Sequence, residues 1–311
     1  MNPEQRNQTS ITEFILLGFS TIPELQILLF LLFLVIYIAT MSGNILIVVL
    51  VVADCHLHTP MYFFLGNLSC LETCYTSTIL PSMLASLLSG DRTISFSGCL
   101  TQYYFFASLV ATECLLLSVM SYDRYLAICN PMHYAAHMSG RSCLQFISGG
   151  FQCSGIITLL ISQLTFCGSN DIDHFFCDLI PLVNLSCNDP LLMEMLALTI
   201  SLIFLVVPFL LTLMSYICII STILRIPSTT GKQKAFSTCS SHLIVVTMYY
   251  GTLMIVYMFP TTNTLSDCKK VLSVFYAVLT PLINPIIYSL RNKEFKGALR
   301  KACRKCRSCF D

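Results

Sequence analysis

Residues 25–53 read LQILLFLLFLVIYIATMSGNILIVVLVVA and contain no Asp, Glu, Lys or Arg. A helix needs roughly 20 apolar residues to cross about 30 Å of hydrocarbon. This run is therefore long enough to cross a membrane as one helix, and it predicts that the chain is a membrane protein.

Further charge-poor runs follow along the whole chain, and Glu72 and Glu113 are the acidic residues that interrupt them. Together the runs predict seven spans near 25–51, 59–88, 97–122, 142–166, 195–224, 235–259 and 271–290. Helices satisfy their own backbone hydrogen bonds inside lipid. The expected fold class is therefore an all-α membrane protein with a seven-transmembrane-helix bundle.

The composition of the whole chain agrees with this fold. The 311 residues are 55% hydrophobic and 11% charged, whereas soluble globular proteins have about 25% charged residues. A water-soluble fold cannot hide that much apolar surface. The composition therefore excludes a cytosolic enzyme, a protein that binds nucleic acid and a disordered chain.

The basic residues lie mainly on one side of the predicted bundle. If the C-terminus is inside the cell, the inner segments hold thirteen Lys and Arg and the outer segments hold four, which accounts for all 17. Cytoplasmic loops accumulate Lys and Arg. We therefore expect a plasma-membrane protein with an extracellular tail over 1–24 and a cytoplasmic tail over 291–311.

Both tails carry sites of expected modification. Asn7 begins an Asn-x-Thr sequence on the outer tail and is the expected glycosylation site. In the inner tail, apolar and basic residues alternate at helical spacing, which predicts an amphipathic helix on the anionic inner leaflet. Cys303, Cys306 and Cys309 are expected to be palmitoylated. A metal cluster is the weaker alternative, because a fourth ligand is missing, and no metal is expected.

Four cysteines lie at the predicted outer face, which is an oxidising environment. They are Cys99, Cys167, Cys177 and Cys187. Spacing alone leaves three pairings open. Disulfides are nevertheless expected, because the acidic loop 167–190 has little other means of ordering itself, although unpaired thiols are the alternative.

Apolar stripes near the outer ends of four predicted helices form the expected ligand-binding cage. Its residues are Tyr103, Phe106, Ala107, Val110, Ala111, Ile200, Ser201, Phe204, Tyr250, Leu253, Met254, Tyr257, Val274 and Ala277. Such stripes also occur in ordinary bundle cores, but the small residues Ala107, Ala111 and Ala277 favour a cavity.

The absence of charged residues from the predicted cage indicates what kind of ligand it binds. The seventh span has no Lys for a Schiff base, and the outer half of the third span has no acid to pair with an amine. The expected ligand is therefore small, largely apolar and uncharged, with hydrogen bonds from Ser201, Tyr250 or Tyr257.

Polar residues within the spans are expected to meet in the middle of the bundle, because ionisable groups are costly in lipid. Glu113 and Arg124 are eleven residues apart and so share one face of the third helix. Glu72, Glu113, Asn44 and Asn284 are expected to form a polar core that holds a sodium ion or a shared proton. A hydrogen-bonded network without an ion is the alternative, and no other cofactor is expected.

Arg124 follows Asp123 at the inner end of the third span. Asp123 could hold the guanidinium at rest, and a rearrangement could transfer it toward Tyr216 or Tyr288 and open a groove for a partner helix. The simpler interpretation is that Arg124 reaches lipid phosphates.

Four motifs carry a resemblance to a known family. Residues 120–131 read MSYDRYLAICNP, in which Asp123, Arg124 and Tyr125 resemble the motif of rhodopsin-like (class A) G-protein-coupled receptors. With PMYFFL at 60–65, KQKAFSTC at 232–239 and PLINPIIY at 281–288, the chain resembles the olfactory receptors. Glu72, Ser82 and Thr230 depart from the family's usual residues, outside these motifs.

The resemblance implies an odorant receptor that activates a stimulatory heterotrimeric G protein and raises cyclic AMP, not an enzyme. It implies that Cys99 pairs with Cys177, and Cys167 with Cys187. It also implies packing or switching roles for Asn44, Arg124, Tyr216, His242, Asn284, Pro285 and Tyr288.

Two other classes of membrane protein are weighed against a receptor. Transporters commonly have internal repeats and broken helices, but the chain shows no repeat and seven spans do not divide equally. An intramembrane enzyme would need a Ser–His pair, a pair of aspartates or a metal cluster in one layer, and none is evident in the sequence.

Overall fold

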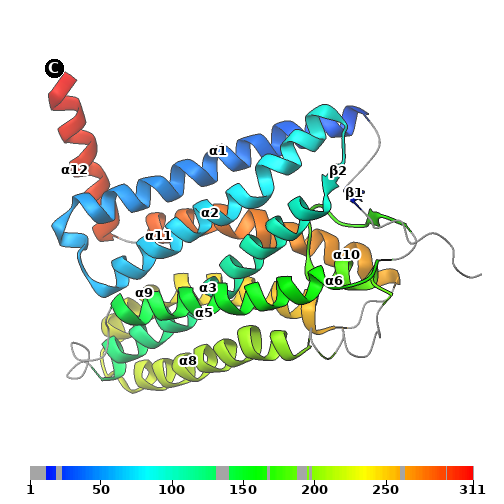
Figure 1. Cartoon of the computed structure of the whole chain (residues 1–311). Coiled ribbons are helices and arrows are strands. Elements are labelled where there is room, and N and C mark those ends of the chain that lie inside the picture. Colours follow the sequence, from blue (N-terminus) through cyan, green and yellow to red (C-terminus); the bar gives the residue numbers. More distant parts are fainter. Residues whose placement is uncertain are drawn as a thin grey trace, which may run out of the picture.

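A computed structural model of the chain describes residues 12–18, 23–130, 140–166, 169–187, 195, 198–259, 263–291 and 293–310. Long helices lie side by side along a common direction (Figure 1). A small sheet lies at one end of the bundle, here called the sheet end. Helix α12 lies at the other, the α12 end, and runs across the bundle axis.

The helices confirm the predicted helical bundle. They are α1 (Pro23–Ala53), α2 (Pro60–Ser89), α3 (Phe96–Cys129), α5 (Gly140–Ser162), α6 (Leu179–Asn184), α8 (Val207–Arg225), α9 (Thr229–Met258), α10 (Asn263–Val274), α11 (Thr280–Arg291) and α12 (Lys293–Phe310). The predicted spans overlap these helices, although the span near 142–166 continues four residues beyond the end of α5 at Ser162. Helix α3 extends seven residues beyond the predicted end at residue 122, so Asp123 and Arg124 lie within a helix.

Large apolar side chains cover the outside of the bundle. On α1, Leu28 is 62% exposed and Val35 64%, and on α8 Met214 is 61% exposed. Among the described residues, five helical stretches are long and apolar enough to cross a membrane: Glu24–Ala53, Phe96–Cys129, Leu198–Arg225, Cys239–Met258 and Asp267–Tyr288. Such a surface suits hydrocarbon rather than water, so the chain is a multi-pass membrane protein.

Two prolines in the spanning helices are each preceded by a π-helical turn. A π-helical turn over Leu202–Val206 comes before Pro208, and another over Phe275–Leu279 comes before Pro281. Proline has no backbone N–H to donate, so nearby carbonyl groups lose a partner. The Tyr75 hydroxyl donates to the carbonyl of Tyr276 at 3.1 Å, which supplies a donor from a neighbouring helix.

The helices approach closely where glycines face a neighbour. A Cβ atom on Gly150 of α5 would lie 2.8 Å from Thr112 Oγ1 and 3.3 Å from the Ser108 carbonyl oxygen, both on α3. A Cβ atom on Gly43 of α1 would lie 3.1 Å from Pro285 of α11. Small residues at these points let helix backbones pack tightly.

A three-stranded sheet, which the sequence patterns do not predict, covers the sheet end of the bundle. The strands β1 (Glu13–Leu16), β2 (Thr93–Ser95) and β3 (Asp171–Ile172) lie in the order β2-β1-β3. Strand β1 is antiparallel to β2 and parallel to β3. Phe14 is fully buried and packs against Phe96 and Phe166. The N-terminal strand therefore ties two loops together.

A disulfide joins Cys99 at the start of α3 to Cys177 in the loop after β3, with 5.5 Å between their Cα atoms. This is the pairing that the family resemblance implied. Cys187 is also disulfide-bonded. Its predicted partner, Cys167, lies outside the described residues.

Candidate functional site

A cavity lies within the bundle near the sheet end. Its volume is about 90 Å³, whereas one water molecule needs about 10–15 Å³ on the same scale. Ten of the fourteen residues predicted for the ligand cage line it: Tyr103, Phe106, Ala107, Val110, Ala111, Ile200, Ser201, Phe204, Leu253 and Tyr257. The cavity has room for one small organic molecule.

The other four predicted cage residues lie outside this lining. Tyr250 and Ala277 are fully buried in the main hydrophobic core, and Met254 and Val274 pack against that core. The Tyr250 hydroxyl donates to the Cys114 carbonyl at 2.6 Å, so this side chain holds α9 against α3. Helical spacing on one helix could not show which members of a stripe a neighbouring helix covers.

The cavity is also lined by an acidic residue, Asp178, that is not among the predicted cage residues. Asp178 follows the disulfide-bonded Cys177, is 2% exposed and lines the cavity from the loop side. The Tyr257 hydroxyl lies 2.8 Å from both oxygens of its carboxylate, and Tyr276 donates to one of them at 3.3 Å. The backbone N–H of Leu179 donates at 2.7 Å. The Asp178 carboxylate therefore joins the loop to α9 and to the π-helical turn before α11.

Helix α5 contributes to the same cavity through Ser154 and Ile157. The sequence predicts no ligand-binding residue on this helix. After Arg141 at its start, this helix has no charged residue to mark a site, and its cavity-facing residues resemble ordinary core. Cys114, Leu179 and Leu205 complete the lining.

Two tyrosines of α9 join this helix to the α3 wall of the cavity, on the side of Asp178 that faces the α12 end. The Tyr249 hydroxyl donates to the Val110 carbonyl at 3.2 Å, close to the bond from Tyr250 to Cys114. Both acceptors belong to α3, and both Val110 and Cys114 line the cavity. A ligand that presses on this wall therefore acts on the contact between α3 and α9.

The predicted polar core lies in the middle of the bundle. Asn44, Glu72 and Glu113 are fully buried and Asn284 is 2% exposed. The Asn284 amide donates to Glu72 Oε1, and the Asn44 amide donates to the Pro281 carbonyl at 3.2 Å. Within the described residues, Asn44 Oδ1, Glu72 Oε2 and both oxygens of Glu113 have no hydrogen-bond donor. Buried acceptors without donors suit a cation or a proton.

The predicted switch residues lie toward the α12 end. The Tyr216 hydroxyl and His242 Nδ1 are 2.6 Å apart, and their rings stack with centroids separated by 5.9 Å. Arg124 is buried and lies near enough to Tyr216, His242 and Tyr288 to act on them electrostatically. The remaining predicted members, Asp123, Tyr125 and Pro285, are buried or half-buried.

The chain is similar to known proteins over most of its length. A family model described as olfactory receptor matches residues 33–305. The chain belongs to the olfactory receptor family. It is 50% identical over 307 residues to olfactory receptor 11L1 of Homo sapiens, which covers 97% of this chain and 95% of that protein. It is 51% identical over 299 residues to olfactory receptor 10A7 of Homo sapiens, with 95% of each chain covered. Olfactory receptor 1f45 of Rattus norvegicus is 48% identical over 299 residues, covering 95% of this chain and 96% of that protein.

The receptor is therefore a class A G-protein-coupled receptor and not an enzyme, and its family supports a role in odorant reception. The four sequence motifs of this family lie on α2, α3, α9 and α11, apart from Asn130, which follows α3, and Pro131, which lies outside the described residues. Of the predicted modification sites, Cys303 is exposed on α12. Asn7 and the side chains of Cys306 and Cys309 lie outside what the structure describes.

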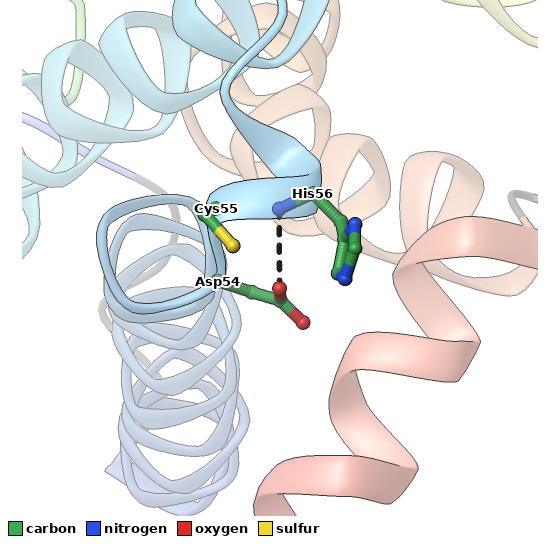
Figure 2. Close-up of side chains that lie close together, drawn as sticks. All are labelled: Asp54, Cys55 and His56. Carbon is green, nitrogen blue, oxygen red and sulfur yellow. Dashed lines mark hydrogen bonds between the residues drawn. The ribbon is translucent and has the colours of Figure 1, made fainter.

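At the α12 end, Asp54, Cys55 and His56 bring three metal-binding atoms within 4.8 Å of one another (Figure 2). The Asp54 carboxylate instead accepts a hydrogen bond from the His56 backbone N–H at 3.2 Å. It also lies 3.6 Å from Lys301 of α12. The backbone hydrogen bond lowers the pKa of Asp54, and Lys301 acts in the same direction. Asp54 therefore caps the short helical turn Cys55–Leu57 and contacts α12, and these two roles explain why the three side chains lie together.

Helix α12 is further held to the bundle by Tyr62, whose hydroxyl donates to Glu294 at 2.8 Å. Phe295 is 1% exposed and belongs to the main hydrophobic core. The predicted amphipathic helix is thus fastened to α2 at its start, while Arg300 and Lys301 face outward.

A second, more polar hollow of about 250 Å³ lies on the other side of Asp178 from the cavity within the bundle. Asp178 lines both spaces. The outer hollow also includes His174, Asp173 and Lys270, of which the last two form an ion pair. Burial lowers the pKa of His174, and Asp178 opposes that effect. His174 Nδ1 lies 3.1 Å from the Phe176 carbonyl oxygen, so the neutral ring suits this position as a donor.

Proposed function

We propose that the receptor binds a small, mostly apolar and uncharged volatile molecule in the cavity of about 90 Å³. The single observation that carries this proposal is that residues from α3, α5 and α9 and from the loop after β3 meet around one buried space. Phe106, Val110 and Leu253 supply apolar walls. Binding pockets of this kind combine apolar walls with a few placed polar groups.

Such a ligand binds weakly. Apolar burial contributes about 25 cal/mol per Å², and much of that gain from a small molecule is offset by its immobilisation. Affinities of about micromolar or weaker are expected. Weak, reversible binding suits a receptor that follows changing ligand concentrations.

The signal passes from the cavity to a stimulatory heterotrimeric G protein at the α12 end. Tyr249 and Tyr250 couple the cavity wall on α3 to α9, and the Tyr216–His242 contact joins α8 to α9 nearer the α12 end. Movement of α9 then frees Arg124 to turn toward Tyr216 or Tyr288. A helix of the G protein enters the opening, and cyclic AMP rises.

The receptor lies in the plasma membrane with the sheet end outside the cell. The distribution of the 17 Lys and Arg residues supports this orientation, as does the Cys99–Cys177 disulfide at the sheet end. In this orientation Asn7 is available for glycosylation, and Cys167 can pair with Cys187. Cys303, Cys306 and Cys309 lie at the inner leaflet as palmitoylation sites.

The polar core holds a sodium ion or one shared proton. Support comes from the four acceptor oxygens of Asn44, Glu72 and Glu113 that have no donor within the described residues. Oxygen ligands suit a hard cation. Glu72 and Glu113 are also close enough for their charges to interact, so a bound positive charge stabilises both carboxylates.

The decisive experiment is a screen of a volatile panel against cells that express the receptor with a cyclic AMP reporter. A ligand-dependent rise that is lost without the stimulatory G protein supports the proposal. Ion currents that persist without any G protein would instead indicate a channel. A panel that gives no response at verified surface expression would contradict the ligand class.

A further inference from the structure

Several hydroxyl side chains of α3 and α5 bond to carbonyl groups of their own helix. Ser108 donates to the Tyr104 carbonyl, Thr112 to the Ser108 carbonyl and Thr158 to the Ser154 carbonyl, each at 2.7 Å. This local bonding is common for Ser and Thr in helices. It leaves these hydroxyl protons unavailable to a ligand.

Ser154 on α5 and Ser201 before the π-helical turn depart from this pattern. Both side chains line the cavity, and they are only 3% and 8% exposed. Neither hydroxyl is hydrogen-bonded within the part of the chain that the structure describes. Buried hydroxyl groups normally find a partner, so a partner within the cavity is expected for both.

The Asp178 carboxylate, the charged acceptor group in the cavity lining, already has hydrogen-bond partners. The Asp178 carboxylate already receives hydrogen bonds from Tyr257, Tyr276 and the backbone of Leu179. A donor on the ligand would have to displace one of these groups. An acceptor on the ligand breaks no existing hydrogen bond, because the hydroxyl groups of Ser154 and Ser201 are available to donate.

We propose that Ser154 and Ser201 donate hydrogen bonds to one carbonyl oxygen of the ligand, and that this receptor recognises small apolar ketones, aldehydes and esters. A carbonyl oxygen has two lone pairs and can accept from both hydroxyls. The inference rests on the proposed function, because it specifies the ligand class for the same cavity. It assigns Ser154 of α5 as a specificity-determining residue.

The test uses pairs of volatile compounds that share a shape but differ in the acceptor. Cyclohexanone is compared with methylenecyclohexane, and acetophenone with alpha-methylstyrene, in the cyclic AMP reporter cells. The carbonyl member of each pair should reach its half-maximal response at a lower concentration. Each hydrogen bond should contribute about a two- to tenfold difference.

The variants Ser154→Ala and Ser201→Ala remove one donor each with little change in volume. Each should reduce the advantage of the carbonyl compound over its hydrocarbon partner by about two- to tenfold. Ser154→Thr, which keeps a hydroxyl, should retain the advantage. Ser148→Ala is the matched control, because Ser148 is exposed on the same helix and accepts a hydrogen bond from Gln152.

Three results would overturn the inference: equal responses to both members of the pairs, an unchanged ratio in Ser154→Ala, or responses to other volatiles without any to carbonyl compounds. Silence toward every volatile would contradict the proposed function instead. Surface staining accompanies each measurement. If Ser154→Ala does not reach the surface, Ser154→Cys supplies a much weaker donor and should show the same loss.

Discussion

The hydroxyl group of Tyr257 on α9 lies 2.8 Å from each oxygen of the Asp178 carboxylate in the loop after β3. This contact joins a helix that continues to the α12 end with a loop fixed by the Cys99–Cys177 disulfide. The two residues also line the cavity. A ligand can therefore influence the position of α9 by changing how this contact is made.

Tyr257→Phe keeps the ring and removes the hydroxyl group. Hydrogen bonds to charged groups are worth about 1.5–3 kcal/mol, so the half-maximal ligand concentration should rise by about ten- to a hundredfold in the cyclic AMP assay. Surface abundance should stay the same. Tyr104→Phe is the control, because Tyr104 packs on Phe105 and Phe151 away from the cavity lining. An unaltered response in Tyr257→Phe would remove this contact from the mechanism.

Arg124→Ala should abolish the cyclic AMP response while leaving ligand binding largely intact. The reason is that Arg124 lies near Tyr216, His242 and Tyr288, far from the cavity lining. Binding of a labelled ligand and cyclic AMP are measured on the same cells. Arg225→Ala, at the exposed end of α8, provides a control for loss of a basic residue. Equal loss of binding and signalling would show that Arg124 has a structural role.

Gly150→Ala should destabilise the contact between α3 and α5. The added Cβ would lie 2.8 Å from Thr112 Oγ1, and overpacking of this kind costs about 1–3 kcal/mol. A lower unfolding temperature in detergent is the expected result. The neighbouring Gly149→Ala serves as the matched control, since a Cβ there meets nothing within 4 Å. Equal effects of both substitutions would mean that helix propensity, not packing, decides the outcome.

His174 should make the sheet end less stable in acid. Burial keeps the pKa of the folded state below the ordinary value of about 6.5. The unfolded state therefore binds more protons at low pH, and stability falls as the pH drops below about 6.5. The unfolding temperature measured between pH 7.5 and 5 should show this loss. His174→Asn, which can still donate to the Phe176 carbonyl but does not titrate, should flatten the dependence; an equally steep curve would assign it to other groups.

The main architecture could be predicted from the sequence because the bilayer imposes a simple rule on it. A span must be long and free of charge, so runs such as residues 25–51 mark helix α1 directly. The helical stripe from Tyr103 to Ala111 likewise predicted one wall of the cavity, since residues on one helix face keep fixed spacing. These inferences depend only on local geometry.

The parts that were missed depend on contacts between distant segments. Asp178 lies in a loop with no periodic pattern, and its place in the cavity follows from the disulfide and from Tyr257. Ser154 looks like any small residue of a helix until α3 and α5 are packed together. Tyr250 belongs to a correct helical stripe but bonds to Cys114. A strand as short as β3 has too few residues to show alternation.

Strand β1 has a consequence for how the receptor is made. Glu13–Leu16 emerges from the ribosome before any membrane helix, yet its partners in β2 and β3 are synthesised only after α2 and α5 respectively. Strand β1 can therefore pair with β2 once α2 has been made, but its pairing with β3 must wait until more than half of the chain has been synthesised. The sheet is therefore assembled in two steps, and a nascent chain stopped after α3 could complete only the β1–β2 pair.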